Sequence, residues 1–277
     1  MKVGVIGSGG REHALCLSLK KSKEISQIYC FPGNAGTHQI ATNVEINLND
    51  FEQLKNFILK EKISYVVVGP EKPLVDGIVD FLEEYNINVF GPNKIASQLE
   101  GSKIFTKKLC EKHNIPTAKF GVLSNIEDAL KFLSGCEFPI VIKADGLAAG
   151  KGVYISENFQ EASSAVNEIF DGKFGKANQL IIEEFLQGEE MSFFVVCDGT
   201  DHKVFGTAQD HKRVGEGDKG KNTGGMGAYS PSRLENDELN KKILEKIIEP
   251  TLQGIKNLNS EYKGLSLIHI SEPTRPY

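Results

Sequence analysis

The residues best suited to chemistry are the glycines and lysines of segment 143–153, KADGLAAGKGV. Apolar runs at 138–142 and 153–155 predict a strand on each side, so the glycines fall in a loop between two strands. Glycines let backbone N–H groups approach an anion closely, and Lys143 and Lys151 add positive charge. The segment therefore predicts a loop that binds a phosphate chain.

A Walker P-loop is the nearest alternative for such a segment. It needs four residues between its glycines, then lysine and a hydroxyl residue at the start of a helix. Here only three residues separate Gly146 from Gly150, Gly152 stands where the hydroxyl should be, and a strand is predicted next. The segment is not a P-loop.

Other segments support a nucleotide site. A lone lysine at a strand end is often a surface residue, but Lys143 is accompanied by Lys103, at the start of a predicted helix. The strand predicted at 179–185 offers backbone groups beside apolar side chains that suit an adenine, and a following acid can accept hydrogen bonds from ribose hydroxyls. Glu183 and Glu184 alone would more often be a solvated pair. The side chains predicted at the nucleoside are Phe185, Leu186 and Glu190.

The turn GSGG at 7–10 follows a predicted strand and precedes a predicted helix. It is half of a dinucleotide fingerprint, but Glu12 replaces the third glycine, and no acid ends the second strand at 31–32. An NAD-dependent dehydrogenase is therefore disfavoured. Amides at a helix start still attract a phosphomonoester, while a turn kept for packing is the alternative.

A third cluster combines QDHKR at 209–213 with NTGGMG at 222–227. An acid, a histidine and two cations usually form a solvated charge run. The glycine-rich companion favours a loop that closes over an anionic substrate. The histidines show no zinc spacing, and Ser8 lacks a GxSxG context, so zinc and hydrolase chemistry are not supported.

Composition limits the possible classes of protein. A chain of 277 residues with 40% hydrophobic and 25% charged residues suits a globular protein of about two domains. A net charge of −5 argues against nucleic acid or an anionic membrane as partner. The 5 cysteines contain no CxxC, which favours reduced thiols in the cytoplasm. No transmembrane or signal-peptide pattern is present in the sequence.

The first hundred residues alternate apolar strands with helical patterns, which predicts an open parallel sheet covered by helices. Ligands of such sheets bind at the carboxyl ends of strands, so the turns at 7–10, 32–36 and 69–71 are expected to line one cleft. The predicted strands are 2–6, 27–31, 65–68 and 88–90, and the predicted helices are 11–22, 50–60 and 75–85.

After a helix predicted at 102–113, the strands are expected to be antiparallel, with one helix at 159–170 between them. Segments 179–185 and 191–197 predict a hairpin-like pair. Segment 215–227 has no periodicity and predicts a mobile loop. Segment 235–258 predicts an amphipathic helix broken near Pro250.

In this order the segments resemble the phosphoribosylamine–glycine ligase family, ATP-grasp enzymes of purine biosynthesis. The resemblance covers residues 1 to 264. REHAL after GSGG and the block DHKRVG…NTGGMGAYSP separate this family from other ATP-grasp enzymes. The matching segments are MKVGVIGSGGREHAL, FPGNAG, VVGPEKPLVDGIVD, FGPNKIASQLEGSKIFTK, IPTA, PIVIKADGLAAGKGV, IIEEFLQGEE, QDHKRVGEGDKGKNTGGMGAYSP and IIEPTL.

The resemblance implies an α/β protein: a Rossmann-like, pre-ATP-grasp domain at 1–101 with an open parallel sheet, then an α+β ATP-grasp domain at 102–264 with a lid at about 117–190. The second domain is expected to be incomplete at its C-terminus. The implied reaction is ATP-dependent ligation of glycine to 5-phosphoribosylamine through a glycyl phosphate. Glycinamide ribonucleotide, ADP and phosphate are the implied products.

The resemblance also implies roles for individual residues. The residues expected at the ATP phosphates are Lys103, Lys143, Gly146, Gly150, Lys151 and Gly152, and those expected at the adenosine are Glu183, Phe185, Leu186 and Glu190. Gly9, Gly10, Arg11, Glu12, Asn34 and Glu71 are expected to face the ribose phosphate. Asp210, Lys212, Arg213 and Asn222, with Thr223, Gly224 and Gly225, are expected to organise glycine and the transferring phosphoryl group.

The chain departs from the family after Gly264. The family continues with a carboxylate–asparagine pair and an RFGDPE-like segment that bind Mg²⁺ or Mn²⁺. Segment 265–277 is expected to be an artefactual tail, with a natural disordered terminus as the alternative, so the polypeptide alone is expected to be impaired. The alternative functions are another ATP-grasp carboxylate–amine ligase or carboxylase, and a non-catalytic nucleotide-binding module. Small molecules are the expected partners, with no nucleic acid, membrane or obligate protein partner.

Overall fold

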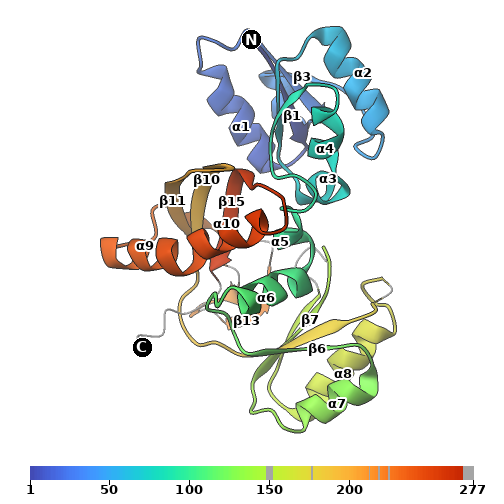
Figure 1. Cartoon of the computed structure of the whole chain (residues 1–277), viewed down its shortest axis with the longest axis vertical. Helices are drawn as coiled ribbons and strands as arrows, with labels where there is room; N and C mark the ends of the chain where they lie inside the picture. The colour runs from blue at the N-terminus through green and yellow to red at the C-terminus, as the bar shows by residue number, and fades with distance from the viewer. Residues whose placement is uncertain (148–151, 176, 212, 218, 224, 271–277) are drawn as a thin grey trace. The chain divides into compact units, whose positions relative to one another are not determined.

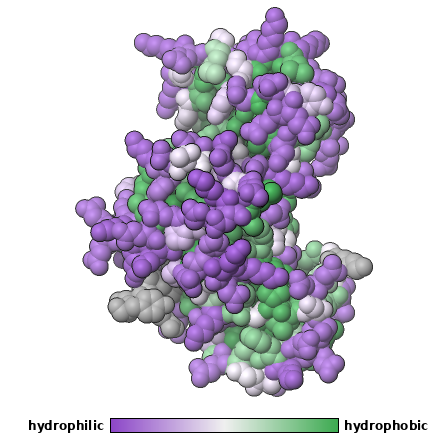
Figure 2. All heavy atoms as spheres, in the orientation of Figure 1, coloured by the Kyte–Doolittle hydropathy of each residue, from purple (hydrophilic) through white to green (hydrophobic). Residues whose placement is uncertain are grey.

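The structure is a computed structural model that describes residues 1–147, 152–175, 177–211, 213–217, 219–223 and 225–270. The chain forms two compact units (Figure 1). The first comprises residues 1–101 with 197–200 and 258–265. The second comprises residues 102–196 and 201–257, and, of the described residues, 266–270. The face seen in Figure 2 is covered mainly by hydrophilic side chains.

The first unit is built on a five-stranded parallel sheet in the order β3-β2-β1-β4-β5. Its strands are rich in valine and isoleucine because both faces of a parallel sheet are covered. The strand order reverses direction between β1 and β4, where ligands of open sheets bind. The predicted parallel sheet is confirmed. The strands are β1 (Lys2–Gly7), β2 (Gln27–Pro32), β3 (Thr42–Asn43), β4 (Tyr65–Val68) and β5 (Asn88–Phe90).

Helices connect these strands. Asp50 caps α2 by accepting a hydrogen bond from the Gln53 amide at 2.9 Å, as a short acidic side chain does at a helix start. The single helix predicted at 75–85 is wrong. Gly77, with φ of +97°, divides it into two short helices, because a left-handed residue cannot continue a helix. The helical segments are α1 (Gly10–Lys20), η1 (Thr37–Gln39), α2 (Phe51–Glu61), α3 (Glu71–Asp76), α4 (Ile78–Glu83) and α5 (Gln98–Gly101).

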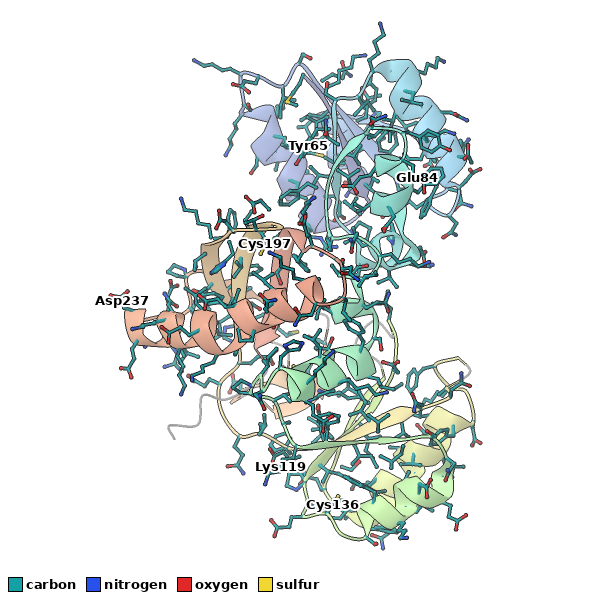
Figure 3. All side chains as sticks on the ribbon, in the orientation of Figure 1. Tyr65, Glu84, Lys119, Cys136, Cys197 and Asp237 are labelled. Atoms are coloured by element: carbon teal, nitrogen blue, oxygen red, sulfur yellow. The ribbon has the colours of Figure 1, made fainter. Side chains whose placement is uncertain are left out.

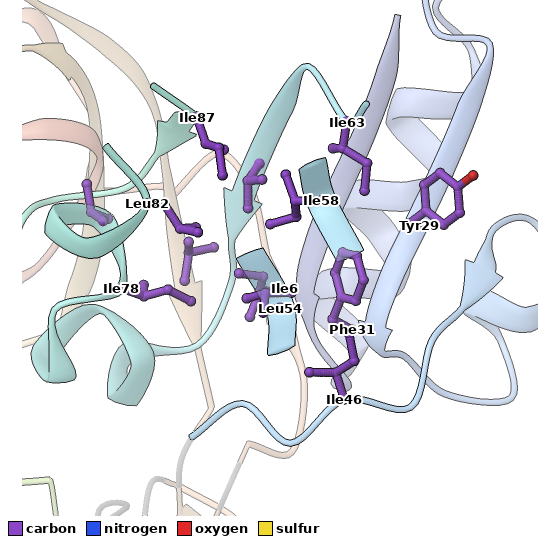
Figure 4. Close-up of a cluster of buried hydrophobic side chains, with 13 residues drawn as sticks. Ile6, Tyr29, Phe31, Ile46, Leu54, Ile58, Ile63, Ile78, Leu82 and Ile87 are labelled. Atoms are coloured by element: carbon purple, nitrogen blue, oxygen red, sulfur yellow. The ribbon is translucent and has the colours of Figure 1, made fainter. Parts of the chain in front are cut away.

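The core of the first unit joins side chains from the sheet and from α2 and α4 (Figure 4). Phe31, Leu54, Ile58 and Leu82 in this cluster have no exposed surface. Burying large apolar side chains of this kind contributes about 1.5–3 kcal/mol each, which fixes the sheet that carries the glycine turns.

The second unit contains a four-stranded antiparallel sheet in the order β6-β9-β7-β8. Two helices pack against each other and against it, and their apolar side chains share one core with β7 and β9. Of these two helices, α8 was predicted at 159–170 and α7 was not, although Asn125 caps α7 in the same way as Asn158 caps α8. The elements are β6 (Phe120–Leu123), α7 (Ile126–Leu133), β7 (Ile140–Ala144), β8 (Val153–Ser156), α8 (Phe159–Phe170) and β9 (Leu180–Glu184).

The predicted hairpin of 179–185 with 191–197 is wrong. Strand β9 pairs with β6 and β7, whereas β10 belongs to another sheet, in the order β14-β11-β10-β15. The apolar side of β9 completes the core beneath α7 and α8, so the chain at 185–190 passes between two sheets instead of turning back. The strands are β10 (Met191–Asp198), β11 (His202–Asp210), β14 (Ala228–Tyr229) and β15 (Lys263–Ile270).

Two further expectations for the second unit need correction. The segment predicted as a loop at 215–227 contains part of a two-stranded ribbon, β12 (Arg213–Gly215) and β13 (Lys219–Asn222). The helix predicted to break near Pro250 is instead continuous through α9 (Asp237–Ile243), a π-helical turn η2 (Leu244–Ile248) and α10 (Glu249–Lys256). The wider π turn accommodates a proline that lacks the N–H an α-helix requires.

Candidate active site

The predicted phosphate-binding lysine, Lys143, lies near the end of β7 beside a buried acid. Its Nζ contacts Glu183 Oε1, and Lys107 Nζ lies 2.7 Å from Glu183 Oε2. The side chain of Glu183 is only 4% exposed, so its charge is compensated inside the protein. Glu183 is therefore neither a solvated residue nor, by its carboxylate, an open ligand for a nucleoside. Lys107 comes from helix α6 (Lys103–Lys112) and was not identified from the sequence.

The start of α6 is joined to the beginning of the glycine loop. Ser102 Oγ donates to both carboxylate oxygens of Asp145, at 3.2 and 3.0 Å, and the Ile104 amide donates to Asp145 Oδ1 at 3.2 Å. Lys103 Nζ donates to the Gly146 carbonyl oxygen at 2.8 Å. The two predicted ATP-binding residues Lys103 and Gly146 are therefore in contact, and Asp145, which was not identified from the sequence, joins the helix start to the loop.

The described ends of the glycine loop are held at its base. Gly146 has φ of +89°, a conformation that glycine adopts without strain, and the Ala144 amide donates to the Gly152 carbonyl oxygen at 2.8 Å. Gly150 and Lys151 lie outside the described residues. The strands predicted on both sides of the loop are present, and they pair with each other, β7 with β8.

The residues predicted at the nucleoside follow β9 directly. Phe185, Leu186 and Glu190 are each partly exposed, so their side chains remain accessible at this end of the strand. Glu184 is bound to the neighbouring strand, since its Oε1 accepts from the Lys119 amide at 3.0 Å and its own amide donates to the Lys119 carbonyl at 3.0 Å. Lys119 is labelled in Figure 3, just before β6.

In the first unit, Asn34 organises the turn after β1. Its Nδ2 donates to the carbonyl oxygens of Ser8, at 2.9 Å, and Gly9, at 3.1 Å. Its Oδ1 accepts from the amides of Gly36, at 2.8 Å, and Thr37, at 3.0 Å. This side chain joins the turns that follow β1 and β2, which is a framework role.

The turn also contains a buried acid. Glu12 is 3% exposed, and its Oε2 accepts from the Gly9 amide at 2.6 Å while its Oε1 accepts from Arg11 Nε at 3.0 Å. Arg11 Nη1 donates to Glu71 Oε1 at 3.1 Å. Burial lowers the pKa of the Arg11 guanidinium, but hydrogen bonds with Glu12 and Glu71 outweigh burial and raise it. Arg11 therefore remains charged, and the predicted residues Gly9, Arg11, Glu12 and Glu71 form one cluster.

Glycines make room for the Glu12 carboxylate. A Cβ on Gly7 would lie 2.7 Å from Glu12 Cδ, and one on Gly69 would overlap Glu12 Oε1. A Cβ on Gly10 would meet nothing within 4 Å, so the turn is open at that position. The carboxyl ends of β1 and β4 thus require glycine because a buried acid lies between them.

The predicted glycine- and phosphoryl-binding block is assembled by backbone pairing. Asp210 pairs with Ala228, the His211 amide donates to the Gly227 carbonyl at 2.9 Å, and Arg213 pairs with Asn222. The Gly225 amide donates to Thr223 Oγ1 at 3.1 Å. Lys212 and Gly224 lie outside the described residues. The two segments that the sequence analysis linked therefore lie beside each other.

A polar network that sequence reasoning missed supports the end of β11. Gln209 Oε1 accepts from Tyr229 Oη at 2.5 Å and from Ser232 Oγ at 3.1 Å. Ser230 Oγ donates to the Thr207 carbonyl at 2.7 Å. The sequence signal for this network is the run AYSPS after the glycine-rich block, whose hydroxyl side chains can hydrogen-bond a neighbouring strand.

In the part of the chain that the structure describes, no group of three or more His, Cys, Asp or Glu side chains gathers as metal ligands could. None of the described helices combines the length and apolar character needed to cross a bilayer.

Two family profiles together match residues 1–271 of the chain. The profile described as phosphoribosylglycinamide synthetase, N domain, matches residues 1–100, and that described as phosphoribosylglycinamide synthetase, ATP-grasp (A) domain, matches residues 101–271. Curated phosphoribosylamine–glycine ligases of Mesorhizobium japonicum and Salmonella typhi are 49% and 48% identical to it over 96% and 95% of this chain. The chain spans 63% and 62% of their respective lengths.

Two solved structures match the chain. The crystal structure of phosphoribosylamine–glycine ligase from Thermotoga maritima matches with a TM-score of 0.81 and 33% identity, over 99% of this chain and 67% of that one. The biotin carboxylase domain of the Hydrogenobacter thermophilus 2-oxoglutarate carboxylase matches with a TM-score of 0.70 and 19% identity, over 100% of this chain and 64% of that one. At that identity the second match shows a shared fold alone.

Proposed function

The chain belongs to the phosphoribosylglycinamide synthetase family, and from this membership we propose that its protein joins glycine to 5-phosphoribosylamine at the expense of ATP. The products are glycinamide ribonucleotide, ADP and phosphate, as in purine biosynthesis. Because the chain spans about 63% of the length of its curated relatives, the proposal concerns the activity of the whole protein.

The reaction proceeds in two balanced steps. A glycine carboxylate oxygen attacks the γ-phosphorus of ATP, the bond to the β–γ bridging oxygen breaks, and ADP leaves. The amine of 5-phosphoribosylamine then attacks the carbonyl carbon of glycyl phosphate, phosphate leaves with the C–O bond electrons, and the nitrogen loses a proton. Positive groups around the transferring phosphoryl oxygens stabilise both steps.

The observation that carries the proposal is the presence of two lysines at the described start of the glycine loop. Lys143 lies near the end of β7, and Lys103 donates to Gly146 at 2.8 Å. We assign the ATP phosphates to these residues. Gly150, Lys151 and Gly152 complete the assigned set.

We assign the adenosine of ATP to the partly exposed segment after β9, with Phe185 and Leu186 against the base and Glu190 at the ribose. Glu183 was expected to join this set. Its carboxylate instead faces two lysines, so we assign it to the phosphate side of the site.

We assign the phosphate and sugar of 5-phosphoribosylamine to the turn after β1. Arg11 and Glu71 are exposed enough to contact a ligand, and the amide of Gly10 lies at the start of α1, whereas the amide of Gly9 already donates to Glu12. Glu12 and Asn34 belong to the framework that holds this turn, because their polar atoms already bind neighbouring protein groups.

Glycine and the transferring phosphoryl group are assigned to the block at the end of β11. Asp210 and the cations Lys212 and Arg213 supply its charges. The remaining assigned residues are Asn222, Thr223, Gly224 and Gly225.

Magnesium, or manganese in its place, accompanies ATP in this proposal. Among the described residues, no three His, Cys, Asp or Glu side chains gather as metal ligands could. The small-molecule substrates are the proposed partners, without an obligate protein partner. The cytoplasm is the proposed location, which suits a protein whose 5 cysteines are free thiols.

The test is a reconstituted reaction with glycine labelled with ¹⁸O in its carboxylate. We expect glycinamide ribonucleotide and phosphate in equal amounts, with one ¹⁸O transferred to the phosphate. Omitting 5-phosphoribosylamine should abolish the ligated product. Turnover with bicarbonate in place of glycine would instead assign the protein to the ATP-grasp carboxylases, and product without ¹⁸O in the phosphate would contradict the acyl-phosphate route.

A further inference from the structure

Two lysines share one buried acid in the second unit. Glu183 is 4% exposed at its side chain, Lys107 12% and Lys143 26%. Each carboxylate oxygen faces a different lysine, with Lys107 Nζ at 2.7 Å from Oε2 and Lys143 Nζ against Oε1. The lysines come from separate elements, α6 and β7, and the acid comes from β9. The cluster is therefore formed by tertiary packing.

The charges of this cluster have a consequence for phosphate binding. The charges of Lys143 and Glu183 alone would sum to zero. If both oxygens of the Glu183 carboxylate contacted Lys143, the carboxylate would compete with phosphate for the Lys143 ammonium group. Lys107 raises the sum to +1 and occupies one of the two oxygens. At low solvent exposure such charges are weakly screened, so this difference acts strongly on a bound anion.

Lys107 itself is surrounded by protein acceptors. Its Nζ donates to Thr117 Oγ1 at 2.6 Å and to the Ala118 carbonyl at 3.3 Å, in addition to its ion pair with Glu183. It also lies 5.4 Å from the centroid of the Phe120 ring. Thr117 and Ala118 accept two of the three N–H donors of this ammonium group, and Glu183 Oε2 forms an ion pair with it without a hydrogen bond. The Lys107 side chain is only 12% exposed. Lys107 therefore acts through Glu183 and not on a ligand.

We propose that Lys107 is a positioning residue for nucleotide binding: it holds the Glu183 carboxylate so that Lys143 keeps its charge and donors available to the ATP phosphates. This inference rests on the proposed function, because it assigns the phosphates to Lys143. Lys107 is assigned no direct contact with the nucleotide and no part in the chemical steps.

The test measures binding of ATP and of inorganic tripolyphosphate to the whole chain by calorimetry. Tripolyphosphate reports on the phosphate contacts without the adenosine. Lys107→Met should weaken both ligands about tenfold, a change of about 1.4 kcal/mol. Lys108→Met is the matched control, because Lys108 is the exposed neighbour on the same helix and carries the same charge. Its binding should stay within about twofold of the unsubstituted chain.

The double variant Lys107→Met/Glu183→Gln separates electrostatics from packing. It removes the acid together with its partner and restores the sum of +1, so tripolyphosphate affinity should return to within about threefold of the original. If Lys107→Met fails to fold, the tripolyphosphate affinity of this double variant still tests the proposal.

Three results would overturn the inference. If folded Lys107→Met binds tripolyphosphate as the unsubstituted chain does, Lys107 has no positioning role. If the double variant binds tripolyphosphate weakly, the electrostatic explanation is wrong. In both cases ATP binding by the unsubstituted chain leaves the proposed function intact. An unsubstituted, folded chain that binds neither ligand overturns the proposed function and this inference together.

Discussion

Ser102 and Asp145, 43 residues apart in sequence, are joined by hydrogen bonds from Ser102 Oγ to both carboxylate oxygens. Ser102 is also the N-cap of α6, since its Oγ accepts from the Phe105 amide at 3.1 Å. The contact fixes the first turn of a helix to the residue that precedes Gly146. The position of Lys103 relative to the glycine loop is thus set by a hydrogen-bonded cap.

Replacing Asp145 with alanine should both destabilise the chain and weaken ATP binding. The loss of a capping carboxylate costs about 1 kcal/mol of unfolding free energy, and the released helix start displaces Lys103 from the loop. Urea unfolding and ATP calorimetry measure the two effects. Asp50→Ala is the control, because Asp50 caps α2 in the other unit. It should cost similar stability and leave ATP affinity unchanged, and an equal loss of affinity in both variants would contradict the prediction.

Gly69→Ala should destabilise the first unit severely. The new methyl group would overlap the Glu12 carboxylate, which is 3% exposed and cannot move outward without leaving the Gly9 amide unpaired. Overpacking of this kind costs about 1–3 kcal/mol. Gly10→Ala is the matched control, since a Cβ there meets nothing within 4 Å and alanine favours a helix. Thermal unfolding of both variants is the measurement, and a Gly69→Ala variant as stable as Gly10→Ala would be inconsistent with the buried acid.

Glu61 should make the stability of the chain depend on pH in the acid range. Its pKa is lowered from 4.5 by the hydrogen bond from Tyr29, at 2.9 Å, and then by Lys2. A lowered folded-state pKa gives stability that is present above the unfolded pKa and is lost as the pH falls through the folded one. The difference in unfolding free energy between the unsubstituted chain and Glu61→Gln should therefore shrink as the pH falls below about 4.5.

Urea unfolding across that pH range measures the difference. Tyr29→Phe removes the largest cause of the lowered pKa and should reduce the pH-dependent part of the Glu61 contribution. A difference between the unsubstituted chain and Glu61→Gln that stays constant as the pH falls would contradict the assignment.

The local patterns of the chain predicted much of its fold. The strands at 65–68 and 88–90 and the helix at 159–170 have the predicted bounds, because hydrophobic periodicity and short turn segments fix such elements locally. The parallel sheet followed from the alternation of strands and helices. The family resemblance is confirmed by the profiles and relatives that match.

Tertiary pairing could not be predicted in the same way. Nothing in the pattern of β9 shows that its partners are β6 and β7 and not β10, because the alternation of side chains is equally compatible with both. The same limit applies to Lys107, whose importance depends on a strand 76 residues further along the chain, at Glu183. The individual residue roles at the site remain predictions.

The central claim is that the lysine-flanked loop between β7 and β8 binds the phosphate chain of ATP, and ATP calorimetry on Lys143→Met tests it most directly. Lys131→Met, an exposed lysine on α7, is the matched control. We predict that Lys143→Met weakens ATP binding at least about tenfold, or about 1.4 kcal/mol, while the control binds as the unsubstituted chain does. A folded Lys143→Met variant with unchanged ATP affinity would contradict the claim.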